Sequence, residues 1–332
     1  MKMLVSGSCG LVGSEAVKYF TEKGWEVIGI DANNRSQFFG TASKTPEYVL
    51  DIRDMAGMKK LFKEHSFDAI IHTAGQPSHD YSKDNVLEDF TINAMGTVIL
   101  LELARTYCPK AVFVHCSTDK IYGWGMRRTD LEERETRWHS DYLYDEHTPF
   151  EPPFSPFGVS KLTADFYVQE YAAQGWLTTG IFRMGCITGR NHEGAEQHGF
   201  LAYLAKCIKE GKTYNIYGYK GKQVRDQIHA YDLVSAFDHF IQKPLAGAVY
   251  NIGGGPERSV SVLEAITLIQ NKLGLGKIDP ETNFWRETFR FEKERFGDRQ
   301  WDVHDVSKFR KDFPEWDYKY SLDDIITDLC KK

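Results

Sequence analysis

The chain has 332 residues, with 41 Lys and Arg against 47 Asp and Glu, so its formal net charge is -6. Hydrophobic residues make up 42% and charged residues 27%, which is ordinary for a folded globular protein and excludes collagen-like, disordered and membrane-spanning classes. The mild acidity argues against a broad basic face for nucleic acid or an anionic membrane, because such binding neutralises phosphates. We therefore expect neither partner.

Cysteine usage and the N-terminus bear on the compartment. The six cysteines form no CxxC pair and no zinc-finger spacing, which indicates reduced thiols rather than disulfides. After Met1 and Lys2 the chain passes directly into an apolar run, without the basic and apolar regions of a signal peptide. The sequence therefore predicts a cytoplasmic protein.

Short apolar runs of β type alternate with segments of helical periodicity in the first half of the chain. Parallel strands need long crossovers, so this alternation predicts a doubly wound α/β fold, a Rossmann-type parallel sheet covered on both faces. Later the rhythm gives way to longer loops, one helix near 200–209 and scattered strands at 215–217 and 248–252. The strands predicted for the first half are 3–6, 26–31, 48–51, 68–72, 111–116 and 178–183.

At about 150 residues per domain, the length allows about two domains. We expect residues 1–184 to form the cofactor domain, with 224–245 returning to it. A smaller, discontinuous α/β substrate domain is expected from 185–223 and 246–332.

A glycine-rich turn follows the first predicted strand and opens the first helix. Such glycines allow a tight turn and a close approach of the backbone to a pyrophosphate, while the helix N-terminus offers N–H groups. The spacing is GxxGxxG rather than GxGxxG, so the motif alone also fits a plain glycine-rich turn. The residues predicted to hold a dinucleotide here are Gly7, Gly10, Leu11, Val12 and Gly13.

An acidic residue, Asp31, ends the second predicted strand, where it can accept the ribose hydroxyls of NAD and repel the extra phosphate of NADP. NAD is therefore the predicted cofactor, although Arg35 leaves NADP open because a flexible Arg could pair with a phosphate. Further contacts with the cofactor are expected near the carboxyl ends of neighbouring strands. The residues expected to make them are Asn33, Arg35, Asp51, Ile52, Ala74, Gly75 and Gln76.

The chain also carries other short motifs, and together they resemble the extended short-chain dehydrogenases/reductases of the nucleotide-sugar epimerase/dehydratase group. The resemblance covers essentially the whole chain and implies that Asn93, Ser117 and Lys161 also contact the cofactor. The motifs that carry it, besides the glycine-rich turn and Asp31, are His72-Thr73-Ala74-Gly75, Asn93, Ser117-Thr118, Gly158-Val159-Ser160-Lys161, Gln223-Val224-Arg225-Asp226 with His229, Asn251-Ile252-Gly253-Gly254 and Arg295-Phe296-Gly297-Asp298.

The resemblance implies a nucleotide-diphosphate sugar as substrate. Two of the C-terminal clusters would hold its diphosphate, and Arg suits that role because its planar fork pairs phosphate oxygens. The substrate contacts expected are Gln76, Thr118, Lys120, Gln223, Arg225, Arg295 and Asp298.

The family's reaction centre is a Ser or Thr, a Tyr and a Lys, the last two as YxxxK, with the Tyr taking the hydroxyl proton. Thr118 and Lys161 match this pattern, but Phe157 stands at the Tyr position and has no hydroxyl. Hydride transfer should then be strongly impaired. Three explanations are open: an engineered knock-out, a natural non-catalytic member, or a substitute base among Tyr122, Tyr142 and Tyr144. The first is favoured because every other element of the site is kept.

The tripeptide Thr118-Asp119-Lys120 bears on the type of reaction. Sugar dehydratases of the family resemble one another in having Thr-Asp-Glu there, and Lys120 cannot serve their elimination chemistry. Epimerisation needs no additional acid. The GKQVRD-x-x-HA run at 221–230 resembles epimerases that invert C2 of a CDP-linked hexose by oxidation to a ketone, rotation and re-reduction. A UDP-sugar 4-epimerase and a non-catalytic NAD-binding sensor or scaffold are the alternatives.

Two further expectations concern metals and assembly. His192, Glu193 and His198 form a His/acid cluster, but its ligand geometry is not readable from sequence and the chemistry needs no metal, so none is predicted. Family resemblance implies a homodimer or homotetramer through helices at 88–106 and 159–174. The apolar residues suited to that interface are Val98, Leu101, Phe166 and Tyr167.

Overall fold

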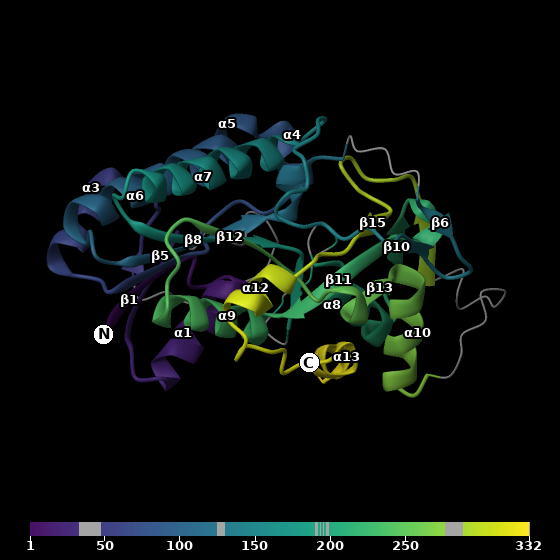
Figure 1. Ribbon diagram of the computed structural model, residues 1–332. Helices are drawn as coiled ribbons and strands as arrows, with labels where there is room; N and C mark the ends of the chain where they lie inside the picture. Colours follow the sequence, from purple (N-terminus) through teal and green to yellow (C-terminus); the bar gives the residue numbers. More distant parts are fainter. Residues whose placement is uncertain are drawn as a thin grey trace.

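The computed structural model describes residues 1–32, 48–124, 130–189, 192, 194, 196, 199–275 and 288–331. A seven-stranded sheet, with all its strand pairs parallel, runs through the centre in the order β12-β8-β5-β4-β1-β2-β3 (Figure 1). The predicted doubly wound Rossmann fold is confirmed. Its strands are β1 (Lys2–Ser6), β2 (Glu26–Asp31), β3 (Tyr48–Val49), β4 (Ala69–His72), β5 (Val112–Thr118), β8 (Thr178–Met184) and β12 (Ala248–Ile252).

Helices cover both faces of this sheet (Figure 1). On one face, α3, α6 and α7 bury residues such as Phe62, Leu100 and Val168 against the strands. On the other face, α1, α9 and α12 bury Phe20 and Phe237 among others. The two apolar layers fix the strand ends, which is where a doubly wound sheet places its ligands. The helices are α1 (Leu11–Glu22), α3 (Met55–Glu64), α6 (Gly96–Tyr107), α7 (Pro156–Ala173), α9 (Ala230–Gln242) and α12 (Ser307–Asp312).

A smaller unit lies beyond the carboxyl ends of the strands and has its own apolar core, formed chiefly by α8, α10, α13, β10 and β14 (Figure 1). A second sheet in it joins β13, β11 and β15, with β9 beside β11. Its elements are β9 (Cys186–Thr188), α8 (Phe200–Glu210), β10 (Tyr214–Tyr217), η3 (Tyr219–Gly221), β11 (Val224–His229), η4 (Pro256–Arg258), β13 (Ser259–Ser261), α10 (Val262–Lys272), β14 (Phe289–Glu292), β15 (Trp301–Asp302) and α13 (Leu322–Cys330).

The remaining described elements are short or form part of one long helical stretch. The stretch from α5 through the π-helical turn η1 into α6 contains the helix predicted at 88–106. No helix in the described part of the chain is long and apolar enough to span a membrane. These elements are α4 (His79–Asp84), α5 (Val86–Phe90), η1 (Thr91–Met95), η2 (Asp119–Tyr122), β6 (Glu132–Glu133) and β7 (Trp138–His139).

The structure differs from the expected domain division at β12. This strand lies within 246–332, the segment expected in the substrate domain, yet it pairs with β8 in the main sheet. Tyr250 and Ile252 are fully buried on the face that also holds Phe182 and Phe309. The physical reason is that α9 provides the long crossover that a further parallel strand requires. α12 also lies within 246–332 and packs on the main sheet through Phe309. The assignment of the remaining segments to a separate substrate domain stays a prediction.

Candidate active site

The glycine-rich turn has the geometry that its sequence predicts. Gly7 has φ +74°, a conformation that favours glycine. A Cβ on Gly13 would lie 2.1 Å from the Gly7 carbonyl oxygen, so α1 packs directly against the turn. Gly10 is the N-cap of α1 and offers no side-chain hydrogen bond. The first N–H groups of α1 therefore lack a capping side chain and present the positive end of the helix dipole to a ligand.

A cavity of about 400 Å³ lies at the carboxyl edge of the sheet, in front of this turn. It brings together residues from six strand ends and from α7. Gly13 lies behind the turn rather than in the lining. Asn33 and Arg35 lie outside the described residues. The predicted cofactor residues that line the cavity are Gly7, Gly10, Leu11, Val12, Asp31, Asp51, Ile52, Ala74, Gly75, Gln76, Ser117 and Lys161.

Two carboxylates mark one end of the cavity. Asp31 accepts a hydrogen bond from the backbone N–H of Cys9 at 3.0 Å, which ties the end of β2 to the glycine-rich turn. Asp51 accepts from the Arg53 guanidinium at 2.7 Å. Burial opposes ionisation of Asp51, but the Arg53 hydrogen bonds outweigh it and hold its pKa below the ordinary value. Both groups can accept hydrogen bonds from a ligand's hydroxyls.

Asn93 and Gln76 support the cavity wall rather than reach into it with their amides. The Asn93 side chain accepts from the Gln76 N–H at 2.8 Å and donates to its carbonyl, and it also donates to Ser160 on α7. The Gln76 amide is 1% exposed and donates to Asp89 at 2.7 Å. The structure thus places Asn93 outside the lining, as the link between the β4 loop and α7.

A second cavity of about 160 Å³ adjoins the first, and His79, Lys120 and Phe200 line both. Thr118 lines the first cavity. The structure therefore brings the predicted substrate residues together from both units of the chain. Those that line the second cavity are Lys120, Gln223, Arg225, Arg295 and Asp298.

The polar groups of the second cavity are held in defined positions. The Arg225 guanidinium pairs with the Asp298 carboxylate and donates to the Arg299 carbonyl oxygen at 2.6 Å. Arg295 lies 4.0 Å from the centroid of the Tyr217 ring. Oε1 of Gln223 is buried without a hydrogen-bond partner among the described residues. A buried acceptor beside two guanidinium groups suits an anionic ligand that also carries hydrogen-bond donors.

Lys120 stands at the border of the two cavities as a fixed cation. Its Nζ lies 2.8 Å from Asp119 Oδ2 and 2.6 Å from Asp302 Oδ2. Burial opposes its charge, but the two carboxylates prevail and raise the pKa of Lys120. Arg299 donates to the same two carboxylates, at 2.9 Å for Asp302. We call Asp119, Lys120, Arg299 and Asp302 the buried charge network.

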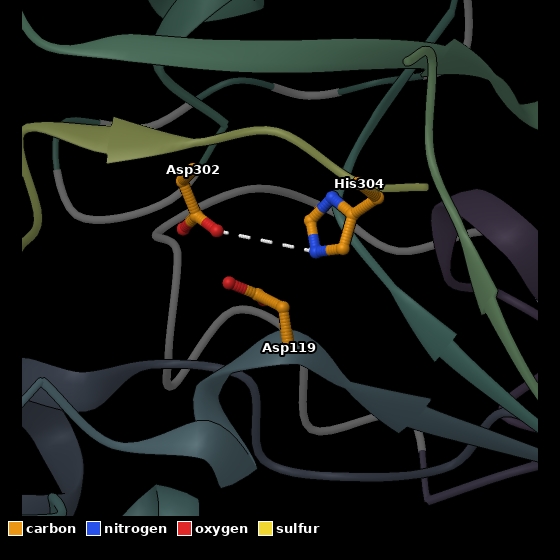
Figure 2. Close-up of side chains that lie close together, drawn as sticks. All are labelled: Asp119, Asp302 and His304. Carbon is orange, nitrogen blue, oxygen red and sulfur yellow. Dashed lines mark ion pairs between the residues drawn. The ribbon is translucent and has the colours of Figure 1, made fainter. Parts of the chain in front are cut away.

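Asp119, Asp302 and His304 lie close enough to suggest a metal site (Figure 2). The donor set argues against it, because both carboxylates are already neutralised by Lys120 and Arg299. His304 lies between two carboxylates, with Nδ1 3.0 Å from Asp226 Oδ1 and Nε2 3.9 Å from Asp302 Oδ1 (Figure 2). This cluster is therefore better described as an ion-pair network. In the other predicted cluster, Glu193 and His198 lie outside the described residues.

Thr118, Phe157 and Lys161 face the first cavity. Ser155 caps α7 by accepting from the Gly158 N–H, and Pro156 starts its first turn, so Phe157 lies near the helix N-terminus. Phe157 and Lys161 are four residues apart and share a face of α7. Nζ of Lys161 donates to the Cys116 carbonyl at 2.6 Å. The arrangement has every part of the expected triad except a hydroxyl on the ring.

The tyrosines considered as substitute bases do not line either cavity in the described part of the chain. The Tyr122 hydroxyl donates to Asn251 at 2.6 Å and accepts from Arg183. Burial raises the pKa of Tyr122 to about 12, which is the wrong direction for a proton acceptor. Tyr144 is packed beside Tyr122, and Tyr142 contacts Thr148. The geometry therefore gives no support to this explanation of Phe157.

Several residues that shape the site were not predicted. Arg299 and Asp302 complete the buried charge network, and Asp165 pairs with Arg183 beneath the cavity, with Nη2 and Oδ1 3.0 Å apart. Asp165 follows Lys161 by four residues on α7, so helical spacing could have indicated its inward direction. For Arg299 and Asp302 the sequence contains no such signal.

Comparison with known proteins agrees with this site. The model of the NAD dependent epimerase/dehydratase family matches residues 3–253, and the chain belongs to that family. NAD is accordingly its cofactor. The turn at Gly7, the free start of α1 and the carboxylate of Asp31 fit that group, because they offer N–H donors to a diphosphate and an acceptor to ribose hydroxyls.

The similar proteins include both epimerases and dehydratases. CDP-paratose 2-epimerase of Salmonella typhi is 31% identical over 287 residues, covering 82% of this chain and 84% of the relative. dTDP-glucose 4,6-dehydratase 1 of Escherichia coli (strain K12) is 29% identical over 321 residues, covering 91% and 85%. The structure of UDP-glucose 4-epimerase from Thermotoga maritima has a TM-score of 0.82 at 23% identity, covering 100% of this chain and 98% of that one. This last likeness concerns the fold.

Proposed function

We propose that the chain is a nucleotide-sugar epimerase that inverts C2 of a CDP-linked hexose of the CDP-paratose or CDP-glucose type. The main observation in support is the position of Lys120, a cation held between two carboxylates where the two cavities meet. A fixed cation cannot exchange protons at C5 and C6 as an elimination requires, so it favours epimerisation over dehydration. The relative named CDP-paratose 2-epimerase supports both the CDP group and the C2 position.

The second cavity is the proposed place of the substrate's diphosphate. Arg225 and Arg295 offer planar N–H forks there, and Gln223 adds a buried amide. Asp298 already pairs with Arg225, so an incoming diphosphate has to replace that carboxylate. Because one anion replaces another, the guanidinium group never stands unpaired in the buried site.

The reacting sugar is proposed to lie where the two cavities meet. NAD, when bound, supplies a reversible acceptor for the hydrogen removed from the sugar carbon. The Thr118 hydroxyl is placed to hold the sugar oxygen, and the Lys120 ammonium favours negative charge on that oxygen. Rotation of the sugar needs only single-bond torsions next to the diphosphate, which Arg225 and Arg295 keep fixed.

A substrate panel tests the proposal. Purified chain and its Phe157→Tyr variant are incubated separately with CDP-paratose, CDP-glucose, UDP-glucose and dTDP-glucose, and products are identified by NMR. Inversion at C2 of a CDP sugar is the expected result. Turnover of UDP-glucose alone, with inversion at C4, would replace the proposal by a UDP-sugar 4-epimerase. A 4-keto-6-deoxy product would make the chain a dehydratase. If neither protein converts any of these sugars, an NAD-binding sensor or scaffold would be favoured.

A homodimer or homotetramer, in the cytoplasm, is also proposed. Large apolar side chains are exposed on α5, η1 and α7, where two helical layers of a second copy could pack. Leu101 does not belong to this surface, because it is fully buried against the sheet. Leu87→Asp should shift sedimentation from dimer or larger to monomer, and a monomeric unmodified protein at micromolar concentration would refute the assembly. The exposed residues are Val86, Leu87, Phe90, Met95, Val159, Phe166 and Tyr167.

A further inference from the structure

Phe157 leaves the proposed reaction without a tyrosine to accept the hydroxyl proton, so turnover by the unmodified chain would require another group in the cavity to accept it. Asp31 and Asp51 line it, but they follow β2 and β3, whereas Thr118 ends β5. In the strand order, β4 and β1 separate β5 from β2. At about 4.8 Å per strand, Asp31 is about 14 Å from the Thr118 end, too far to reach the same oxygen.

Most of the other titratable groups that line the first cavity are poor proton acceptors. Asp119 already accepts hydrogen bonds from Lys120 and Arg299, so its carboxylate oxygens are occupied. Burial raises the pKa of Cys116 to about 12, so that thiol does not ionise readily. Cys186 behaves in the same way. Lys120 is itself held as a cation by its two carboxylates.

The two histidines of the lining have buried ring nitrogens. His79 packs edge-on against the Phe157 ring with centroids 4.9 Å apart, and both its ring nitrogens are buried beneath the cavity surface. His192 directs Nδ1 to the Thr188 hydroxyl at 3.3 Å, and its Nε2 is also buried. Neither ring presents a nitrogen to a ligand in the cavity.

Lys161 differs from all of these groups. It lies one helical turn after Phe157, on the same face of α7, and its Nζ reaches the Cys116 carbonyl, two residues before Thr118 on β5. Among the described residues it forms no ion pair with a carboxylate within 4.0 Å. Burial lowers the pKa of Lys161 because the ammonium loses hydration, and the nearby Asp165 and Asp89 offset only part of that loss.

We propose that Lys161 is the proton acceptor of this chain, taking the role that a tyrosine at position 157 would have. In the proposed step, the lone pair of Nζ forms an N–H bond with the sugar hydroxyl proton as the O–H bond breaks. NAD, when bound, would accept the carbon's hydrogen with its electron pair and so be reduced, while the alcohol would become a ketone. The same ammonium returns the proton when the ketone is reduced on the opposite face. This inference rests on the proposed function.

Four proteins and one control test it: the unmodified chain, Lys161→Arg, Phe157→Tyr, the double variant, and Lys60→Arg on the exposed face of α3. Each is assayed for inversion of CDP-paratose and CDP-glucose and for NAD content after purification. Arginine keeps the charge and the donors of Lys161 but does not deprotonate. Lys161→Arg should therefore retain NAD and lose about 10²- to 10⁴-fold in rate. Lys60→Arg should match the unmodified chain.

The double variant separates proton transfer from mere positioning. If Lys161 accepts the proton, a tyrosine at 157 supplies a new acceptor, and the double variant should recover at least tenfold over Lys161→Arg. A double variant no faster than Lys161→Arg would overturn the assignment. A rate of Lys161→Arg within threefold of the unmodified chain would also overturn the assignment. The same holds if the unmodified chain shows no turnover while Phe157→Tyr is active. Both of these results would leave the epimerase proposal standing. Silence of Phe157→Tyr and the unmodified chain on every sugar would overturn both proposals.

Discussion

Replacing Asp165 by Ala should destabilise the fold beneath the active site. Asp165 is fully buried and accepts from Arg183 through Nε at 3.1 Å and Nη2 at 3.0 Å. It also accepts from Ser117 at 2.7 Å and from Gln169 at 2.6 Å. Removing the carboxylate leaves the Arg183 guanidinium buried, with the Tyr122 hydroxyl as its remaining hydrogen-bond partner among the described residues.

The expected loss follows from that unpaired charge. Removing one partner of a buried ion pair costs about 3–5 kcal/mol. For 332 residues at about 2.1 cal/mol/K per residue, the entropy of unfolding is about 0.7 kcal/mol/K. A loss of about 4 kcal/mol therefore corresponds to a fall in Tm of about 6 °C.

Thermal and urea unfolding of three variants measure this loss. Asp165→Ala should show the full effect, and Gln169→Ala, which removes one of the carboxylate's other donors, should cost less than about 1.5 kcal/mol. In Asp165→Leu/Arg183→Met both charges are absent, so most of the loss should be recovered. If Asp165→Ala lost less than about 1 kcal/mol, or the double variant were as unstable as Asp165→Ala, the pairing argument would be refuted.

Three further results are expected. Burial, reinforced by Lys161, lowers the pKa of His72 to about 3, so below the ordinary value of 6.5 the unfolded chain binds a proton that the folded chain does not. Stability should therefore fall as the pH drops from 6.5 towards 3, with a smaller slope in His72→Asn; equal slopes in urea titrations would contradict this. Gly13→Ala should lose bound NAD and about 1–3 kcal/mol of stability, because its methyl group would lie 2.1 Å from the Gly7 oxygen; Ser14→Ala is the control. Arg225→Met should raise the KM for a CDP sugar at least tenfold and leave NAD content unchanged; an unchanged KM would remove Arg225 from the substrate site.

The main sheet could be predicted because its signals are local. Each apolar run of the first half became a strand with boundaries within two residues of those expected, as 26–31 and 178–183 illustrate. β12 was assigned elsewhere because its pairing with β8 depends on a crossover of about 60 residues that includes β9 and β11 of the second sheet. A five-residue apolar run cannot indicate which sheet will bury it.

The site could be predicted where residues follow a strand or share a helix turn. Asp31, Thr118 and Lys161 are of that kind, and all three line the first cavity. The partners of Lys120 could not be predicted, since Asp302 lies 182 residues further along the chain. Only the folded chain shows that Asp302 joins Asp119 in holding Lys120 as a fixed cation.

The buried charge network also limits how the family's reaction types can interconvert. A Lys120→Glu change would recreate the Thr-Asp-Glu tripeptide of the dehydratase-like pattern. In this chain it would place a third carboxylate against Asp119 and Asp302, with Arg299 and the more distant Arg225 as the remaining cations. Like charges at such distances in a buried site are strongly unfavourable. A path from this protein to a dehydratase therefore has to change position 302 before or together with position 120, so the order of substitutions is constrained by a residue outside the motif.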